Sequence, residues 1–160
     1  MRNLIFVDTE TTGLDPYDAS LVELTWATLD SEPQTLWFGV KEVPDFIDNL
    51  IGFTKRGIAG RVSPYADVEA FLAASDGQTM VAANPGFDKG FIDAAGLWRF
   101  HYRMLDIESY AMAKLALDTV PSMKEIHDEV SQYIDITTPD HTSRNDVLAM
   151  RDAYAYLETL

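Results

Sequence analysis

Two acidic residues close the first apolar segment of the chain and give the strongest chemical signal in the sequence. Asp8 and Glu10 follow directly on an apolar run at residues 4–7, whose residue types and length predict a buried β-strand. Side chains alternate along a strand, so both carboxylates are expected on the same face. Because unpaired buried charge is costly, two carboxylates at a strand end favour a site for a hard divalent cation.

Three later residues have side chains suited to metal binding or proton transfer, and each also has a purely structural interpretation. Asp88 lies in the first turn of a helix predicted after an Asn-Pro dipeptide, where an acid also stabilises the helix dipole. Asp146 fits a capping-box pattern that begins at Ser143. His141 lies in a polar loop, where a histidine is commonly only solvated. Taken together with the two acids of the first strand, these residues favour one shared site.

The elements that would position these side chains predict one α/β domain of residues 1–160 with a mixed sheet flanked by helices. Short links between the first three strands predict an antiparallel meander. The predicted strands are residues 4–8, 21–29, 34–40, 79–83 and 102–105. One helix is predicted to begin at residue 44, and a last helix is predicted to follow residue 143. Four more are predicted between them, at residues 65–74, 84–96, 107–117 and 122–133.

Apolar spacing also indicates which faces these helices bury. The helix that begins at Pro44 is expected to bury Phe46, Ile47, Leu50 and Ile51. The segment at residues 53–63 has two glycines and three basic residues and is expected to be mostly loop.

Composition limits the class of protein. The absence of cysteine excludes a disulfide scaffold and a zinc–thiolate site, and 47% hydrophobic residues are enough for an ordinary core. No signal peptide is recognisable and no stretch approaches the roughly 18 apolar residues of a membrane span, so we expect a soluble, cytoplasmic protein with no membrane partner. A net charge of −14 disfavours binding of long duplex DNA through its phosphates. Any nucleic-acid site must therefore be local and carry its own cations.

Three sequence patterns surround the candidate residues. Residues 6–16 read Phe-Val-Asp-Thr-Glu-Thr-Thr-Gly-Leu-Asp-Pro, residues 84–88 read Asn-Pro-Gly-Phe-Asp, and a histidine precedes an aspartate by five positions at residues 141 and 146. In this order and spacing, the patterns resemble the three motifs of the DEDDh 3′→5′ exonucleases, in the DnaQ-like, RNase H-like superfamily. The resemblance extends from residue 4 to about residue 157. One departure is Ser143, at a position where the family often has a small apolar residue.

This resemblance implies an RNase H-like sheet and a metal-dependent phosphodiester hydrolase. It implies that two Mg²⁺ or Mn²⁺ ions are held by Asp8, Glu10, Asp88 and Asp146, with two-metal hydrolysis at the 3′ end. Independently of the family, four converging carboxylates cannot all stay ionised without cations, because like charges raise one another's pKa values. The resemblance makes His141 the general base, so activity is expected to rise with pH as the histidine becomes neutral.

Substrate contacts are also implied by the resemblance. The backbone at Thr9 would hold the terminal nucleotide, Leu14 would pack against the last bases, and Asn84 would contact sugar or phosphate, although a helix-cap role for Asn84 is equally expected. Four basic residues near the motifs are candidate phosphate contacts or ordinary surface charges: Lys89, Arg99, Arg103 and Arg144.

These observations leave several functions open. The first hypothesis is a 3′→5′ exonuclease that releases nucleoside monophosphates from single-stranded DNA ends in proofreading or DNA repair, with a polymerase or replication partner as one option. The second keeps the chemistry but takes RNA 3′ ends, as in RNase T-like or oligoribonuclease-like enzymes. A catalytically silent protein-binding module and an acidic mimic of DNA are the non-enzymatic alternatives. Neither explains why Asp8, Glu10, Asp88, His141 and Asp146 all match the motifs.

Overall fold

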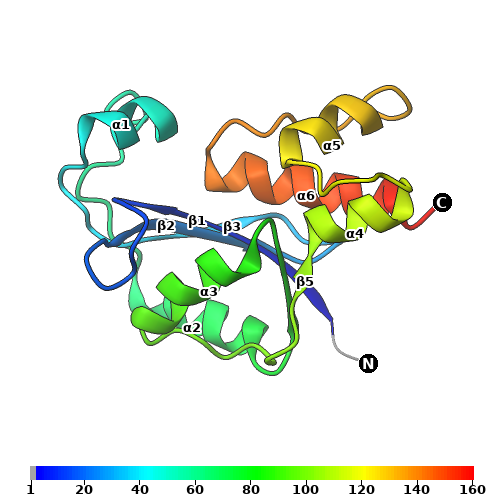
Figure 1. The fold of residues 1–160 in the computed structure, drawn as a ribbon. Coiled ribbons are helices and arrows are strands. Elements are labelled where there is room, and N and C mark those ends of the chain that lie inside the picture. The colour runs from blue at the N-terminus through cyan, green and yellow to red at the C-terminus, as the bar shows by residue number, and fades with distance from the viewer. Residues whose placement is uncertain (1–2) are drawn as a thin grey trace.

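The computed structural model describes residues 3–160 and contains a five-stranded sheet between two layers of helices (Figure 1). The strands are β1 (Leu4–Thr11), β2 (Leu21–Ala27), β3 (Gln34–Trp37), β4 (Thr79–Ala82) and β5 (Leu105–Asp106). Their spatial order is β3-β2-β1-β4-β5. The first three strands pair antiparallel, whereas β4 pairs parallel with both β1 and β5. The predicted mixed sheet with an antiparallel first half is therefore confirmed.

Helices cover both faces of this sheet. They are α1 (Asp45–Ile51), α2 (Tyr65–Ser75), α3 (Pro85–Ala94), α4 (Ile107–Lys114), α5 (Met123–Val130) and α6 (Ser143–Leu157). One face is covered by α4, α5 and α6, and the opposite face by α2 and α3 (Figure 1). Among residues 3–160, none of the helices has the length and apolar character needed to cross a membrane.

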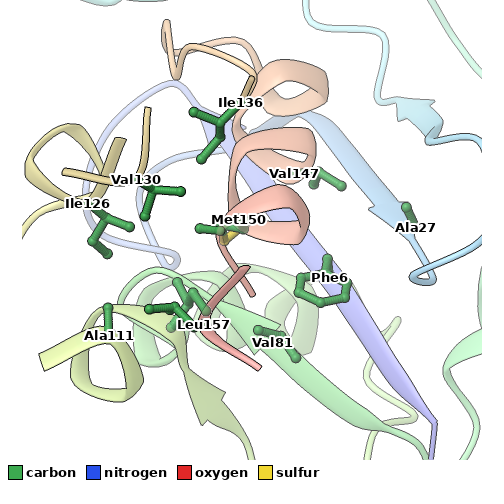
Figure 2. Packing of buried hydrophobic residues seen from close by; sticks show 12 residues of the cluster. Phe6, Ala27, Val81, Ala111, Ile126, Val130, Ile136, Val147, Met150 and Leu157 are labelled. Atoms are coloured by element: carbon green, nitrogen blue, oxygen red, sulfur yellow. The ribbon is translucent and has the colours of Figure 1, made fainter. Parts of the chain in front are cut away.

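The central strand β1 is buried on both faces, and this fixes the direction in which its acids point. Phe6 packs into the cluster formed by α4, α5 and α6 (Figure 2), whereas Val7 packs against α2 and α3. Burial of a large apolar side chain contributes roughly 1.5–3 kcal/mol, so a slip of one residue in the register of β1 is unfavourable. By the same alternation, Asp8 and Glu10 continue the row of Phe6 on the face that α6 covers.

All five strands differ from the predicted bounds, β2 and β4 only because they end two residues and one residue early. β1 runs to Thr11 rather than ending at Asp8, because its last residues pair with β2. The two acids therefore belong to the ladder itself and not to the turn that follows. β3 ends at Trp37 rather than at residue 40, since Gly39 has a left-handed φ of 72° that interrupts an extended chain. β5 contains only two residues, since it starts three positions later than predicted and ends one position later.

The first helix buries a narrower stripe than its sequence predicts. Ile47 and Ile51 are buried beside β2, whereas Phe46 and Leu50 are exposed to solvent. Pro44 stands immediately before the helix at the N-cap position. A helix of seven residues that packs against one edge of the sheet buries only a single row of side chains four positions apart.

Candidate metal centre

Three of the predicted metal ligands meet in space. Asp8 and Glu10 of β1 and Asp146 of α6 each offer a carboxylate oxygen, and these oxygens all lie within 4.8 Å of one another. The arrangement follows from packing, because α6 lies across β1 and brings its first turns to the row continued by Asp8 and Glu10. A donor set made only of carboxylate oxygens suits hard cations such as Mg²⁺ and Mn²⁺.

The fourth predicted ligand, Asp88, lies next to this group but outside its close set of oxygens. It is in the first turn of α3 and only 2% exposed. The hydroxyl of Thr9 donates a hydrogen bond of 2.8 Å to its carboxylate. Burial raises the pKa of Asp88 to about 7, and the charge of Asp88 in turn raises the pKa of Asp8. The four acids are thus electrostatically coupled at the same end of β1.

Burial and mutual repulsion both oppose ionisation of these acids. Burial is the largest cause of the raised pKa of Asp8, followed by the charges of Asp88 and Glu10. Burial followed by the charge of Asp146 raises the pKa of Glu10 to about 9, and burial also raises the pKa of Asp146. Such a cluster is unfavourable as four bare anions at neutral pH, whereas bound divalent cations would relieve both the repulsion and the lost hydration.

His141 approaches the cluster of acids from the loop before α6. Its backbone adopts a left-handed φ of 58°, which is uncommon outside glycine. The loop is fixed by Asp140, whose carboxylate accepts hydrogen bonds from the backbone and hydroxyl of Thr142 and from the amide of Asn145. The backbone N–H of Asp140 donates to Asp146 at 3.0 Å. The unusual backbone at His141 is therefore held by its neighbours, as expected where strain serves a site.

The predicted capping box at the start of α6 is wrong. The N-cap residue is Thr142, and Ser143 is the first helical residue rather than the cap. The side chain of Ser143 is fully buried and shares a hydrogen bond of 2.6 Å with the hydroxyl of Thr25 on β2. Ser143 therefore ties the start of α6 to the sheet, and Asp146 is left free of the capping role that the sequence suggested.

A cavity of about 460 Å³ opens beside this centre. Asp8, His141 and Asp146 line one part of it, and side chains of α5 line another, including Lys124 and His127. The sequence alone, with Asp128 and Glu129 beside His127, predicts an ordinary surface residue. His127 is instead partly buried in the cavity wall, where its Nε2 lies 3.3 Å from the hydroxyl of Thr138. Sequence spacing gave no sign of this position because it depends on how α5 packs beside α6.

The residues predicted to contact substrate differ in their surroundings. Leu14 is 83% exposed in the turn after β1. The side chain of Thr9 is buried and is used by Asp88, so only its backbone remains for the role predicted from the resemblance. Asn84 occupies the N-cap position of α3 with a left-handed φ of 51° and makes no side-chain cap hydrogen bond. Its side chain is exposed, so the expected capping contact is not formed.

The basic residues near the motifs have partners elsewhere in the protein. Lys89 lies over the ring of Trp98 and 3.6 Å from Asp93. Arg144 donates to the carbonyl of Pro33 and pairs with an exposed acid of the β2–β3 turn. Arg99 and Arg103 likewise contact the carbonyl or ring of the residue that precedes each of them in the chain.

Solved structures share this fold across almost the whole chain. Brucella melitensis NrnC with bound Mg²⁺ aligns with a TM-score of 0.55 and 16% identity, covering 99% of this chain and 73% of NrnC. NrnC has also been solved bound to pGG. The zinc-bound complex of E. coli ExoI with single-stranded DNA aligns with a TM-score of 0.70 and 13% identity, covering 99% of this chain. Exonuclease X in complex with 5′-overhanging duplex DNA gives 0.67 and 18%, covering 98% of this chain and 91% of its own.

The fold is RNase H-like. At identities of 13–18% these alignments show a common architecture. The chain spans 41% of the length of ExoI and most of the length of Exonuclease X. No protein-family model matches the sequence, and no curated protein matches it either.

Proposed function

We propose that this protein is a DnaQ-like 3′→5′ exonuclease of the DEDDh type that releases nucleoside monophosphates from single-stranded DNA ends. The observation that carries the proposal is the meeting of Asp8, Glu10 and Asp146, whose ligand oxygens lie within 4.8 Å of one another. Asp88 and His141 lie beside them, as the sequence motifs require. The fold shared with ExoI and Exonuclease X, both solved with DNA, supports this choice.

In this proposal, the four acids would hold two Mg²⁺ or Mn²⁺ ions at the site of phosphodiester hydrolysis. Asp8 and Glu10 supply ligands from the rigid central strand, while Asp88 and Asp146 approach from two different helices. Bound divalent ions would supply activation of a water molecule and stabilisation of the leaving 3′ oxygen. Because the ligands come from packed elements of the fold, little reorganisation is needed when the substrate arrives.

His141 is proposed as the general base. It lines the cavity with Asp8 and Asp146 and is exposed to solvent. In its neutral form it would accept a proton from the attacking water, a contribution typically worth about 10²–10⁴ in rate. The hydrogen bonds that Asp140 accepts would keep the loop, and with it the imidazole, directed at the same space.

The net charge of −14 is compatible with this substrate. A single-stranded end needs only a local site, and bound metal ions would provide the positive charge that contacts the phosphate. An RNA substrate, as in RNase T-like or oligoribonuclease-like enzymes, is the second candidate, and the likeness to NrnC bound to pGG favours it.

The test is digestion of 5′-labelled single-stranded DNA and RNA oligonucleotides with Mg²⁺ or Mn²⁺. A ladder that shortens one nucleotide at a time from the 3′ end of DNA is expected, and it should vanish in Asp88→Ala. The matched control is Asp93→Ala on the same helix, whose side chain is 61% exposed and should leave the ladder intact. A ladder only on RNA would select the second candidate, and no ladder with either metal would overturn the proposal in favour of a binding module.

A further inference from the structure

A fifth acid is buried beside the candidate metal centre and is not one of its proposed ligands. Glu23 on β2 is 1% exposed and pairs across the strands with Glu10 on β1. Partners directly opposite in an antiparallel pair point to the same face of the sheet. The carboxylate of Glu23 therefore lies on the α6 side, one strand away from the proposed ligands.

One cation neutralises this acid. Arg56, in the turns after α1, donates to both carboxylate oxygens of Glu23 at 2.8 and 2.9 Å. Its guanidinium also donates to the carbonyl of Ile51 at 3.2 Å and lies 5.8 Å from the ring centre of Trp37. A bidentate, stacked guanidinium loses little additional freedom in forming the pair, so its charge is held in one place.

Glu23 also contacts the start of the helix that carries Asp146. The backbone N–H of Ser143 lies 3.5 Å from Glu23, in the first turn of α6, where the helix dipole favours an anion. Three segments far apart in the sequence thus meet at Glu23: β2, the turns that carry Arg56, and α6. Two of them also carry or flank the proposed metal ligands.

The charges of Glu23 and Arg56 are close enough to act electrostatically on the metal centre. Glu23 stands directly opposite Glu10 in the β1–β2 ladder, and Arg56 is bound to Glu23, so both charges lie beside the proposed ligands. The two partners therefore act on the centre with opposite signs. As long as both are present, their sum adds almost no net charge to the cluster.

We propose that Glu23 and Arg56 are a charge-compensated pair whose neutrality preserves the affinity of the candidate centre for divalent cations. This inference rests on the metal centre of the proposed function. Glu23 holds β2 and α6 together with a carboxylate, and Arg56 cancels that charge so that it does not compete with the ligand set. Loss of Glu23 alone leaves the guanidinium facing the centre as an uncompensated cation, which repels Mg²⁺ and Mn²⁺.

Calorimetric titration of the full chain with Mg²⁺ and with Mn²⁺, without nucleic acid, tests the pair. Glu23→Gln is expected to weaken metal binding on the order of tenfold, the effect of one unit charge near a divalent ion in a partly solvated interior. The double variant Glu23→Gln with Arg56→Met removes both charges and should return the affinity to within about threefold of the wild type.

The matched control is Glu32→Gln, which breaks an exposed ion pair with Arg144 and should leave metal affinity unchanged. A purely structural role for the pair makes the double variant weaker than Glu23→Gln, and that result would overturn the inference. Thermal unfolding of each variant, measured alongside, shows whether it is folded at the titration temperature.

The titration also separates this inference from the proposed function. If the wild-type protein binds neither metal, both the proposed function and the role of the Glu23–Arg56 pair are excluded. If the wild-type protein binds metal and digests oligonucleotides, and Glu23→Gln binds metal equally well, only the role of the pair is excluded.

Discussion

Replacement of Asp88 by asparagine should stabilise the metal-free protein while abolishing the proposed nuclease activity. Asp88 is almost fully buried, and its pKa is raised from 3.8 to about 7, chiefly by burial. The folded protein therefore binds more protons than the unfolded chain between these values, so its stability falls as the pH rises through this range. Asparagine keeps an oxygen for the hydroxyl of Thr9 and carries no charge. The stability of the variant therefore does not fall as the pH rises through this range.

The size of the effect follows from the same shift. A rise from 3.8 to about 7 corresponds to about 4 kcal/mol at pH 8, at 1.36 kcal/mol for each pKa unit. Relaxation and water entry reduce the penalty of a buried charge, and we expect an observable gain of about 1–2 kcal/mol. For a chain of 160 residues this corresponds to an increase in Tm of about 3–6 °C.

The assay is thermal unfolding in the presence of a chelator at pH 8 and at pH 5. The gain in Asp88→Asn should be largest at pH 8 and shrink towards pH 5, where the wild-type carboxyl takes up its proton. Added Mg²⁺ should raise the Tm of the wild type more than that of the variant. Asp93→Asn, an exposed change on the same helix, should shift Tm by less than about 1 °C. A variant less stable than the wild type at pH 8, or equally affected at both pH values, would refute the reasoning.

Three further changes test other parts of the site and fold. His141→Gln should lower the rate about 10²–10⁴-fold at saturating metal and remove the rise of activity with pH, while calorimetry shows metal binding intact; a variant with the wild-type pH profile would exclude this residue as the base. Ser143→Ala leaves the hydroxyl of Thr25 with one fewer partner and should lower the free energy of unfolding by about 1 kcal/mol in denaturant titration; no loss would show that this buried contact is dispensable. Ser122→Ala removes the capping box of α5 and should cost about 1 kcal/mol in the same titration without changing metal affinity, so weaker metal binding would contradict the separation of this cap from the centre.

Local sequence signals were sufficient for the main elements and for the proposed ligand set. The apolar run before Asp8 and the Asn-Pro start of α3 each report short-range preferences that tertiary packing did not override. A buried strand that ends in two acids is physically expensive, so the sequence itself indicated that something must compensate those charges. The parallel pairing of β4 with β1 then places α3, with Asp88, at the same end of the sheet.

Other features depend on contacts between distant segments and were not predictable from one sequence. The Ser143 hydroxyl bonds to a residue 118 positions earlier, which decides that it anchors the helix rather than caps it. The pairing of Glu23 with Arg56 spans 33 positions. An acid inside a strand of mostly apolar residues was the available signal for that pair, since Glu23 lies within a fully buried β2. The position of His127 in the cavity wall follows from the packing of α5, and the sequence around His127 does not predict it.

The most direct test of the central claim is anomalous diffraction from crystals of the wild-type protein grown or soaked with Mn²⁺. We expect anomalous peaks coordinated by Asp8, Glu10 and Asp146, with Asp88 reaching the same pair of ions, and loss of peak height in Asp88→Asn. Well-ordered side chains with no Mn²⁺ between them at saturating metal, or Mn²⁺ bound only elsewhere on the protein, would contradict it.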